Sequence, residues 1–215
     1  MDDRPPGIRR VCVAAGWEAP GGAGPGGASG RDDAAGERRI VREALISACA
    51  AAGLQRGLPN QQRHGSAEVL LLPAGIDEPR VLAALTRAIA AELRRINAAG
   101  GRRRLRLVLV FHEGVVVLEP AGFRGAAIGR ACRLAGAPQA RSALASHPVS
   151  DLVVLLTDRI FDDLAGQHCD PELGAGRFER VELDAWICVP ARAERPSAPG
   201  ANRGRNTVDK IRDAR

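Results

Sequence analysis

The stretch that decides the fold is residues 103–134, which read RRLRLVLVFHEGVVVLEPAGFRGAAIGRACRL. Residues 105–111 are apolar except for Arg106, and the β-branched residues among them are typical of a strand that is buried on at least one face. Residues 112–114 (His-Glu-Gly) predict a tight turn, because glycine can adopt a positive φ. Residues 115–118 then predict a second strand, antiparallel to the first.

The end of this stretch predicts a helix. Residues 119–123 are expected to form a loop, and residues 125–134 turn helical. Five small residues in this helix let another backbone approach closely: Gly125, Ala126, Ala127, Gly129 and Ala131.

The rest of the chain predicts a mixed order of strands and helices. Further strands are expected at residues 8–15, 68–72, 151–156, 178–183 and 185–189. Helices are expected at residues 37–52, 77–99, 139–145 and 158–164, the second of them capped by Asp77. Residues 54–65 read as a polar loop. A mixed order that includes hairpins favours an α+β fold over a doubly wound parallel sheet.

Composition favours one domain. A chain of 215 residues can bury a real core. We expect that domain to span residues 8–190, with a flexible Gly/Pro-rich loop at 16–36, and residues 191–215 to form a disordered basic tail. The five cysteines form no CxxC pair and read as reduced thiols. With no signal peptide and no long apolar run, the sequence predicts a cytoplasmic protein without a membrane span.

The excess of basic over acidic residues does not by itself predict a nucleic-acid partner. The net charge of +6 permits an anionic partner, but aromatic residues make up only 3% of the chain. A groove that binds single-stranded nucleic acid typically has aromatic side chains among its basic ones, so nucleic acid is not the expected partner. The basic run at residues 102–104 and Arg106 reads as a solvated strand edge.

The central stretch resembles the class III nucleotidyl (adenylate/guanylate) cyclase homology domain, in its short actinobacterial form. The family's H-x-G stands here at residues 112–114, and its helix pattern G-x-x-V-N-x-A-x-R-L stands at residues 125–134. Arg133 occupies the position of the family's Arg, whereas Gly129 replaces its Asn. The resemblance covers residues 8–190. It implies a ferredoxin-like core with a mixed, mainly antiparallel sheet and helices packed against it.

The resemblance also implies a reaction, the attack of a nucleotide's 3′-hydroxyl on its own α-phosphate. Two metal ions held by two aspartates assist this attack. In the family one Asp ends the first strand and the other lies in a turn before the second strand. Ala14 and Ser66 stand at these positions here. Two protomers usually share each site, which implies a homodimer or pairing with another cyclase-like domain.

These departures predict a catalytically degenerate module with a regulatory or nucleotide-sensing role and no metal cofactor. A purine nucleotide is the ligand that the resemblance implies. Gly65, Ser66, Gly125 and Gly129 are the candidate nucleotide-binding positions, and Arg133 is the candidate transition-state arginine. Arg133 could equally be an ordinary arginine at the C-terminal end of a helix, where its charge interacts with the helix dipole.

Two alternatives stay open. In the first, the chain is an active cyclase in which Glu18 or Glu68 replaces a missing aspartate and holds Mg²⁺ or Mn²⁺. In the second, it is a nucleic-acid-binding ferredoxin-like domain, favoured only by the basic pI.

Overall fold

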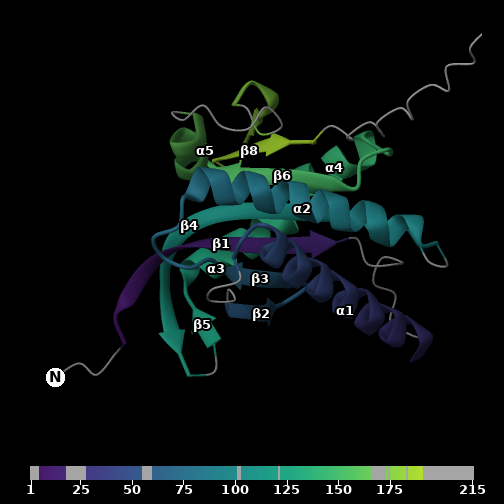
Figure 1. Cartoon of the computed structure of the whole chain (residues 1–215), viewed down its shortest axis with the longest axis horizontal. Coiled ribbons are helices and arrows are strands. Elements are labelled where there is room, and N and C mark those ends of the chain that lie inside the picture. Colours follow the sequence, from purple (N-terminus) through teal and green to yellow (C-terminus); the bar gives the residue numbers. More distant parts are fainter. Residues whose placement is uncertain are drawn as a thin grey trace, which may run out of the picture.

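One mixed sheet organises the protein (Figure 1). The computed structural model describes residues 5–17, 28–54, 60–100, 103–120, 122–165, 173, 175–182 and 184–190. Within these residues eight strands form a sheet in the order β2-β3-β1-β4-β6-β8-β7, with β5 paired to β4. Only β4 and β6 are parallel among the strand pairs described. The α+β class and the mainly antiparallel sheet are therefore confirmed.

The strands are β1 (Gly7–Trp17), β2 (Asn60–His64), β3 (Ala67–Leu71), β4 (Leu107–Glu119), β5 (Gly122–Arg124), β6 (Leu152–Thr157), β7 (Glu179–Val181) and β8 (Ala185–Cys188). The helices are α1 (Ala28–Ala51), α2 (Glu78–Ala98), α3 (Ala126–Ala135), α4 (Pro138–Ser146) and α5 (Asp158–Ala165), with a 3₁₀ turn at Ala175–Arg177. None of the described helices combines the length and apolar character that a membrane span requires.

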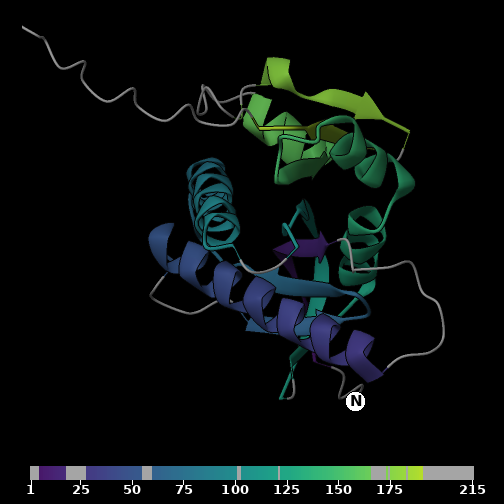
Figure 2. The ribbon, with the colours of Figure 1, turned by 90° about the vertical axis from the view of Figure 1, so that its right-hand side faces the viewer.

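Two helical layers cover the two faces of the sheet (Figure 2). Residues of α1, α2 and α5 pack in one apolar cluster with Val11, Val13 and Ala15 of β1. Residues of α3 and α4 pack in a second cluster with Cys12 and Ala14. This split follows from the alternation of side chains along a strand, which sends neighbouring residues to opposite faces.

The start of α2 is formed as its sequence predicts. The Asp77 carboxylate accepts a hydrogen bond from the Arg80 N–H at 3.3 Å, and proline stands in the first turn. The buried residues of α2 then recur at helical spacing: Leu82, Leu85, Ile89, Leu93 and Ile96.

The predicted turn at residues 112–114 is wrong. β4 runs unbroken from Leu107 to Glu119 and pairs with β1 over its length, from Trp17↔Leu107 to Gly7↔Val117. The hairpin exists, but its turn lies at Pro120, and its second strand is β5. The His-Glu-Gly segment lies inside a ladder of eleven residue pairs between β1 and β4, which holds it extended, and this tertiary pairing overrides the local turn preference.

Gly114 has a different role from the predicted one. It is not among the described glycines with a positive φ. A Cβ at this position would lie 2.6 Å from the Ala127 Cβ, which is too short for any real contact. Gly114 therefore lets α3 approach β4 closely.

The predicted loop at residues 54–65 contains an edge strand that apolar periodicity could not reveal. β2 reads NQQRH and pairs with β3 through the Gly65-Ser66 turn. Its Gln62 side chain binds the backbone of β5 at two points. Nε2 donates to the Phe123 carbonyl at 2.6 Å, and Oε1 accepts from the Phe123 N–H at 3.0 Å. We call this pair of bonds the Gln62 clasp.

The first connection is shorter than predicted. β1 continues through Gly16 and Trp17, and α1 begins at Ala28 rather than at residue 37. Residues 18–27 and the tail at 191–215 lie outside the described part of the chain.

The arginines before β4 do more than line a solvated edge. Arg104 forms an ion pair with Asp151 and donates to the carbonyls of Pro148 and Val149, each at 2.6 Å. Arg106 is half-buried and donates to the Ser150 carbonyl at 3.0 Å, to the His147 carbonyl at 2.9 Å and to that of Leu144. Together they hold the connection between α4 and β6.

Candidate functional site

The end of β1 lies beside the β2–β3 turn. Ala15 is the cross-strand partner of Glu68, so Gly16 and Trp17 continue past the point where β3 begins. Gly65 has φ +61°, and this allows the two-residue turn with Ser66. The structure therefore places Gly16 and Trp17 beside Ser66, whereas Ala14 pairs with Val69 inside the sheet.

A small cleft lies at this meeting point, with a volume of about 80 Å³. α3 closes one wall tightly, since a Cβ on Gly16 would lie 2.9 Å from the Ala135 carbonyl oxygen. The cleft is lined by Gly16, Trp17, Ser66, Ala67, Val108, Cys132, Ala135, Gly136, Arg141 and Leu144.

Arg141 supplies the charge of this cleft, and sequence reasoning missed it. It lies on α4 and donates from Nη1 to the Gly136 carbonyl oxygen at 2.5 Å. Cys132 also lines the cleft, but burial raises the pKa of its thiol to about 11. The thiol is therefore protonated at neutral pH and is a poor nucleophile. No sequence signal distinguishes Arg141 from the chain's many other arginines, because its role depends on how α3 and α4 pack.

The residues described at this cleft do not fit two divalent cations. Hard cations need several oxygen ligands, yet none of the lining residues carries a carboxylate. Ala14, at the first aspartate position, is fully buried in the apolar cluster under α3. Throughout the described residues, no group of three or more His, Cys, Asp or Glu side chains could hold a metal ion. Glu18 lies outside those residues.

Glu68 faces away from the α3 side of the sheet. Its neighbour Val69 packs under α3, whereas Leu70 packs with α1 and α2. Because side chains alternate along a strand, Glu68 points to the same side as Leu70. Its side chain is only 3% exposed and accepts a hydrogen bond from Gln61 Nε2 at 3.3 Å. A metal bound by Glu68 would therefore lie on the face opposite to Ala14.

The candidate residues of α3 separate into two groups. Gly125 has φ +153°, and a Cβ there would lie 2.7 Å from the Val115 carbonyl oxygen, so it serves the junction with β4. Gly129 and Arg133 instead share the outer face of the helix, one turn apart. Arg133 is exposed. Among the described residues, a Cβ on Gly129 would meet only the Arg133 Nη1 atom within 4 Å, at 3.4 Å.

His112 lies in β4, on the α3 side of the sheet. Its Nδ1 is 3.2 Å from the Thr157 hydroxyl oxygen at the end of β6. Burial, and next the positive charge of Arg130, lower the pKa of His112 to about 4. The imidazole is therefore neutral at physiological pH and acts as a hydrogen-bonding group.

Comparison with known proteins supports the fold. No family profile and no curated protein matches the sequence. Among solved structures, an adenylate/guanylate cyclase/hydrolase from Silicibacter pomeroyi matches with a TM-score of 0.51 and 18% identity, over 86% of this chain and 100% of that one. A bacterial light-regulated adenylyl cyclase matches with a TM-score of 0.46 and 13% identity, over 86% of this chain and 91% of that one. The chain thus has the nucleotidyl cyclase-like fold that the resemblance implied.

Proposed function

We propose that this chain is a nucleotidyl cyclase-like module that no longer makes a cyclic nucleotide and that acts as a regulatory or nucleotide-sensing partner in a dimer. The observation that carries the proposal is the cleft where β1 ends beside the Gly65-Ser66 turn. It offers a guanidinium from Arg141 and no carboxylate among its lining residues. Such a cleft favours a phosphate group and disfavours the two cations of the cyclase reaction.

The size of the cleft supports a site shared by two chains. A volume of about 80 Å³ is well below the ~300 Å³ at which small-molecule pockets begin. A nucleotide therefore needs further walls from a second copy of this chain or from another cyclase-like domain. Gly129 and Arg133 lie on an outer helix face that is open for such a partner.

Gly129 supports the dimer independently. Glycine inside a helix is less favourable than alanine by about 1 kcal/mol. Packing within the described part of the chain does not require it here, because only the Arg133 side chain would meet its Cβ there. Close approach by a second chain would explain why glycine occupies this position.

The first experiment tests catalysis. The pure protein is incubated with ATP or GTP and Mn²⁺, and cyclic AMP and cyclic GMP are measured. We expect no product. Turnover that disappears in Glu68→Ala or Glu18→Ala would replace this proposal with the active cyclase that uses atypical ligands.

The second experiment tests the dimer by light scattering. We expect a dimeric mass for the wild type and a monomeric mass for Gly129→Leu with an unchanged or higher melting temperature. Ala98→Leu, which adds the same side chain at an exposed position of α2, should leave the dimer intact. A wild type that is monomeric at high micromolar concentration would refute the shared site.

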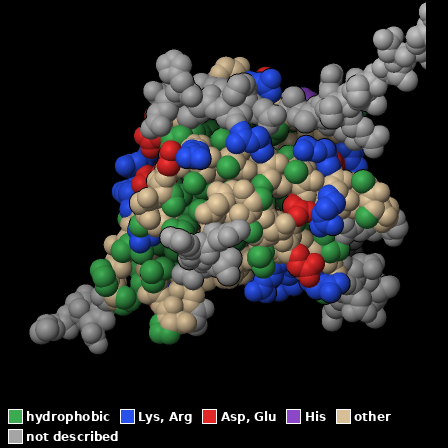
Figure 3. Space-filling view, in the orientation of Figure 1, with side chains coloured by type: hydrophobic (Ala, Val, Ile, Leu, Met, Phe, Trp, Pro, Cys, Tyr) green, Lys and Arg blue, Asp and Glu red, His purple; other side chains and the backbone are tan. Residues whose placement is uncertain are grey.

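The nucleic-acid alternative receives little support from the surface. On the face seen in Figure 3, basic side chains lie beside acidic ones and do not form one continuous basic patch. Retention on random oligonucleotides that falls steeply with salt would revive this alternative.

A further inference from the structure

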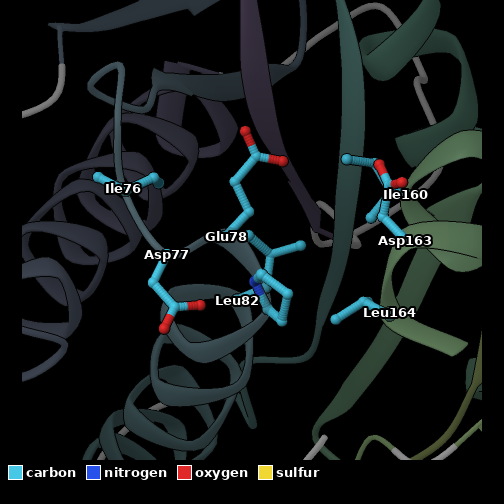
Figure 4. A pocket seen from close by; sticks show the side chains of 8 residues that line it. Ile76, Asp77, Glu78, Leu82, Ile160, Asp163 and Leu164 are labelled. Atoms are coloured by element: carbon cyan, nitrogen blue, oxygen red, sulfur yellow. The ribbon is translucent and has the colours of Figure 1, made fainter. Parts of the chain in front are cut away.

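A second cavity, on the opposite face of the sheet from α3, has no part in the proposed function. It has a volume of about 310 Å³ and lies between the first turn of α2 and the helix α5 (Figure 4). Its lining joins residues that are far apart in the sequence. They are Ile76, Asp77, Glu78, Pro79, Leu82, Ile160, Asp163 and Leu164.

The lining combines an apolar surface with acidic groups on two walls. Ile160 and Leu164 of α5 are buried in the core cluster, as is Leu82 of α2. Figure 4 shows Glu78 on the α2 wall and Asp163 on the α5 wall. The cavity can therefore hold a ligand whose apolar part contacts the apolar lining while its cationic group lies near the carboxylates.

Nearby charges leave this space negative. Glu113 lies behind it on β4 and is shared between Arg159 at 2.5 Å and Arg9 at 3.6 Å. Burial raises the pKa of Glu78, and the negative charges of Glu113 and Asp163 raise it further against the opposing effect of Arg159. The positive end of the α2 dipole is compensated by the Asp77 cap.

We propose that this cavity binds a small organic cation with an apolar body, such as an aryl amidinium or an alkylammonium. Its volume lies at the lower end of the ~300–1,000 Å³ of small-molecule pockets. A metal ion fits less well, because the described residues contain no group of three or more His, Cys, Asp or Glu side chains that could hold one. A cation in this cavity would pair with the half-buried Glu78 and the exposed Asp163, and it gains more from Glu78 than it would from a carboxylate in water.

The probe for this site is benzamidine, which is cationic at neutral pH, with the uncharged benzamide as its isosteric control. Binding is followed by amide chemical shifts and by the fluorescence of Trp186. That ring stacks on Phe161 of α5 at a centroid distance of 3.8 Å and donates to Asp158 at 2.9 Å. We expect saturable shifts at the start of α2 and in α5 with benzamidine and not with benzamide.

Substitutions of the carboxylates test the assignment. Glu78→Gln and Asp163→Asn should each weaken benzamidine binding about fivefold, as for a partly exposed charge pair. Asp162→Asn is the matched control, since Asp162 is an exposed α5 carboxylate outside the lining. No saturable shift at about 10 mM benzamidine, equal binding of benzamide, or equal weakening by Asp162→Asn would each overturn the proposal.

This inference does not depend on the proposed function. The titrations contain no nucleotide, and the cavity lies within one chain, on the face opposite to the β1 cleft. If benzamidine does not bind, the cyclase-like proposal is unaffected. If a cyclic product is detected, the proposal of a cation site in this cavity is unaffected.

Discussion

Substitution of Gly114 by alanine should force α3 away from β4. The new Cβ would lie 2.6 Å from the Ala127 Cβ, 3.4 Å from His112 Nε2 and 3.6 Å from the Ala127 Cα. Both Cβ atoms are fixed directly to backbone, so no rotamer change relieves the contact. The separation must grow by about 1 Å to reach ordinary van der Waals distance, and a helix or a strand must shift to provide it.

The expected net cost is about 1–2 kcal/mol. Overpacking of a filled core costs about 1–3 kcal/mol, while removal of a glycine restricts the unfolded chain and returns about 0.4–1 kcal/mol. For a protein of this size, each kcal/mol corresponds to about 2–4 °C in melting temperature. Denaturation in guanidinium chloride, followed by circular dichroism, measures the same quantity through its midpoint.

A double-mutant cycle identifies the contact. Ala127→Gly alone should destabilise the fold by about 1–2 kcal/mol, because a helix loses an alanine and the core a methyl group. Combined with Gly114→Ala, it should remove the clash and give a coupling energy of about 1 kcal/mol or more. Gly136→Ala is the control, since the nearest described atom to its Cβ would be the Cys132 carbonyl oxygen at 3.7 Å. A neutral Gly114→Ala, or strict additivity of the pair, would refute the close-approach explanation.

Three further changes test other contacts. Arg106→Ala should cost about 2 kcal/mol, because buried carbonyls lose a charged donor, whereas Arg80→Ala at an exposed position should change little. The pKa of His112 is lowered from 6.5 to about 4, so the unfolded chain binds more protons within this window. Stability should therefore fall as the pH drops from 6.5 towards 4, and His112→Asn should flatten that part of the melting-temperature profile. Gln62→Glu should destabilise more than Gln62→Ala, because a carboxylate cannot donate to the Phe123 carbonyl and repels it; equal stability of the two variants would argue against the Gln62 clasp.

The elements that sequence reasoning found are those whose signal is local. α2 has a capping aspartate, a proline in its first turn and a long apolar periodicity, and β6 is a continuous apolar run. Each pattern is contained in one short, continuous segment of the sequence. The cyclase-like fold followed from the central stretch because its strand, loop and helix are contiguous.

The elements that sequence reasoning missed depend on distant residues. The extended form of His112 to Gly114 is set by pairing with β1, a hundred residues earlier in the chain, and β2 has no apolar residue by which to detect it. The same distinction holds at the candidate site. The resemblance located Ser66, whereas Arg141 and the cavity between α2 and α5 arise only when helices pack.

The Gln62 clasp limits how copies of this protein can associate. Within the described residues, β2 and β5 each have a single strand partner, and without the clasp both would offer free backbone groups to a neighbouring chain. With it, the side-chain amide takes the place of an incoming strand at Phe123. The open stretches of the described sheet then include β7, which carries Glu179 and Arg180, and the first residues of β1, which carry Arg9 and Arg10. Charged, short borders resist strand addition and fibril growth. The dimer proposed above is therefore expected to form through helix faces rather than by strand addition.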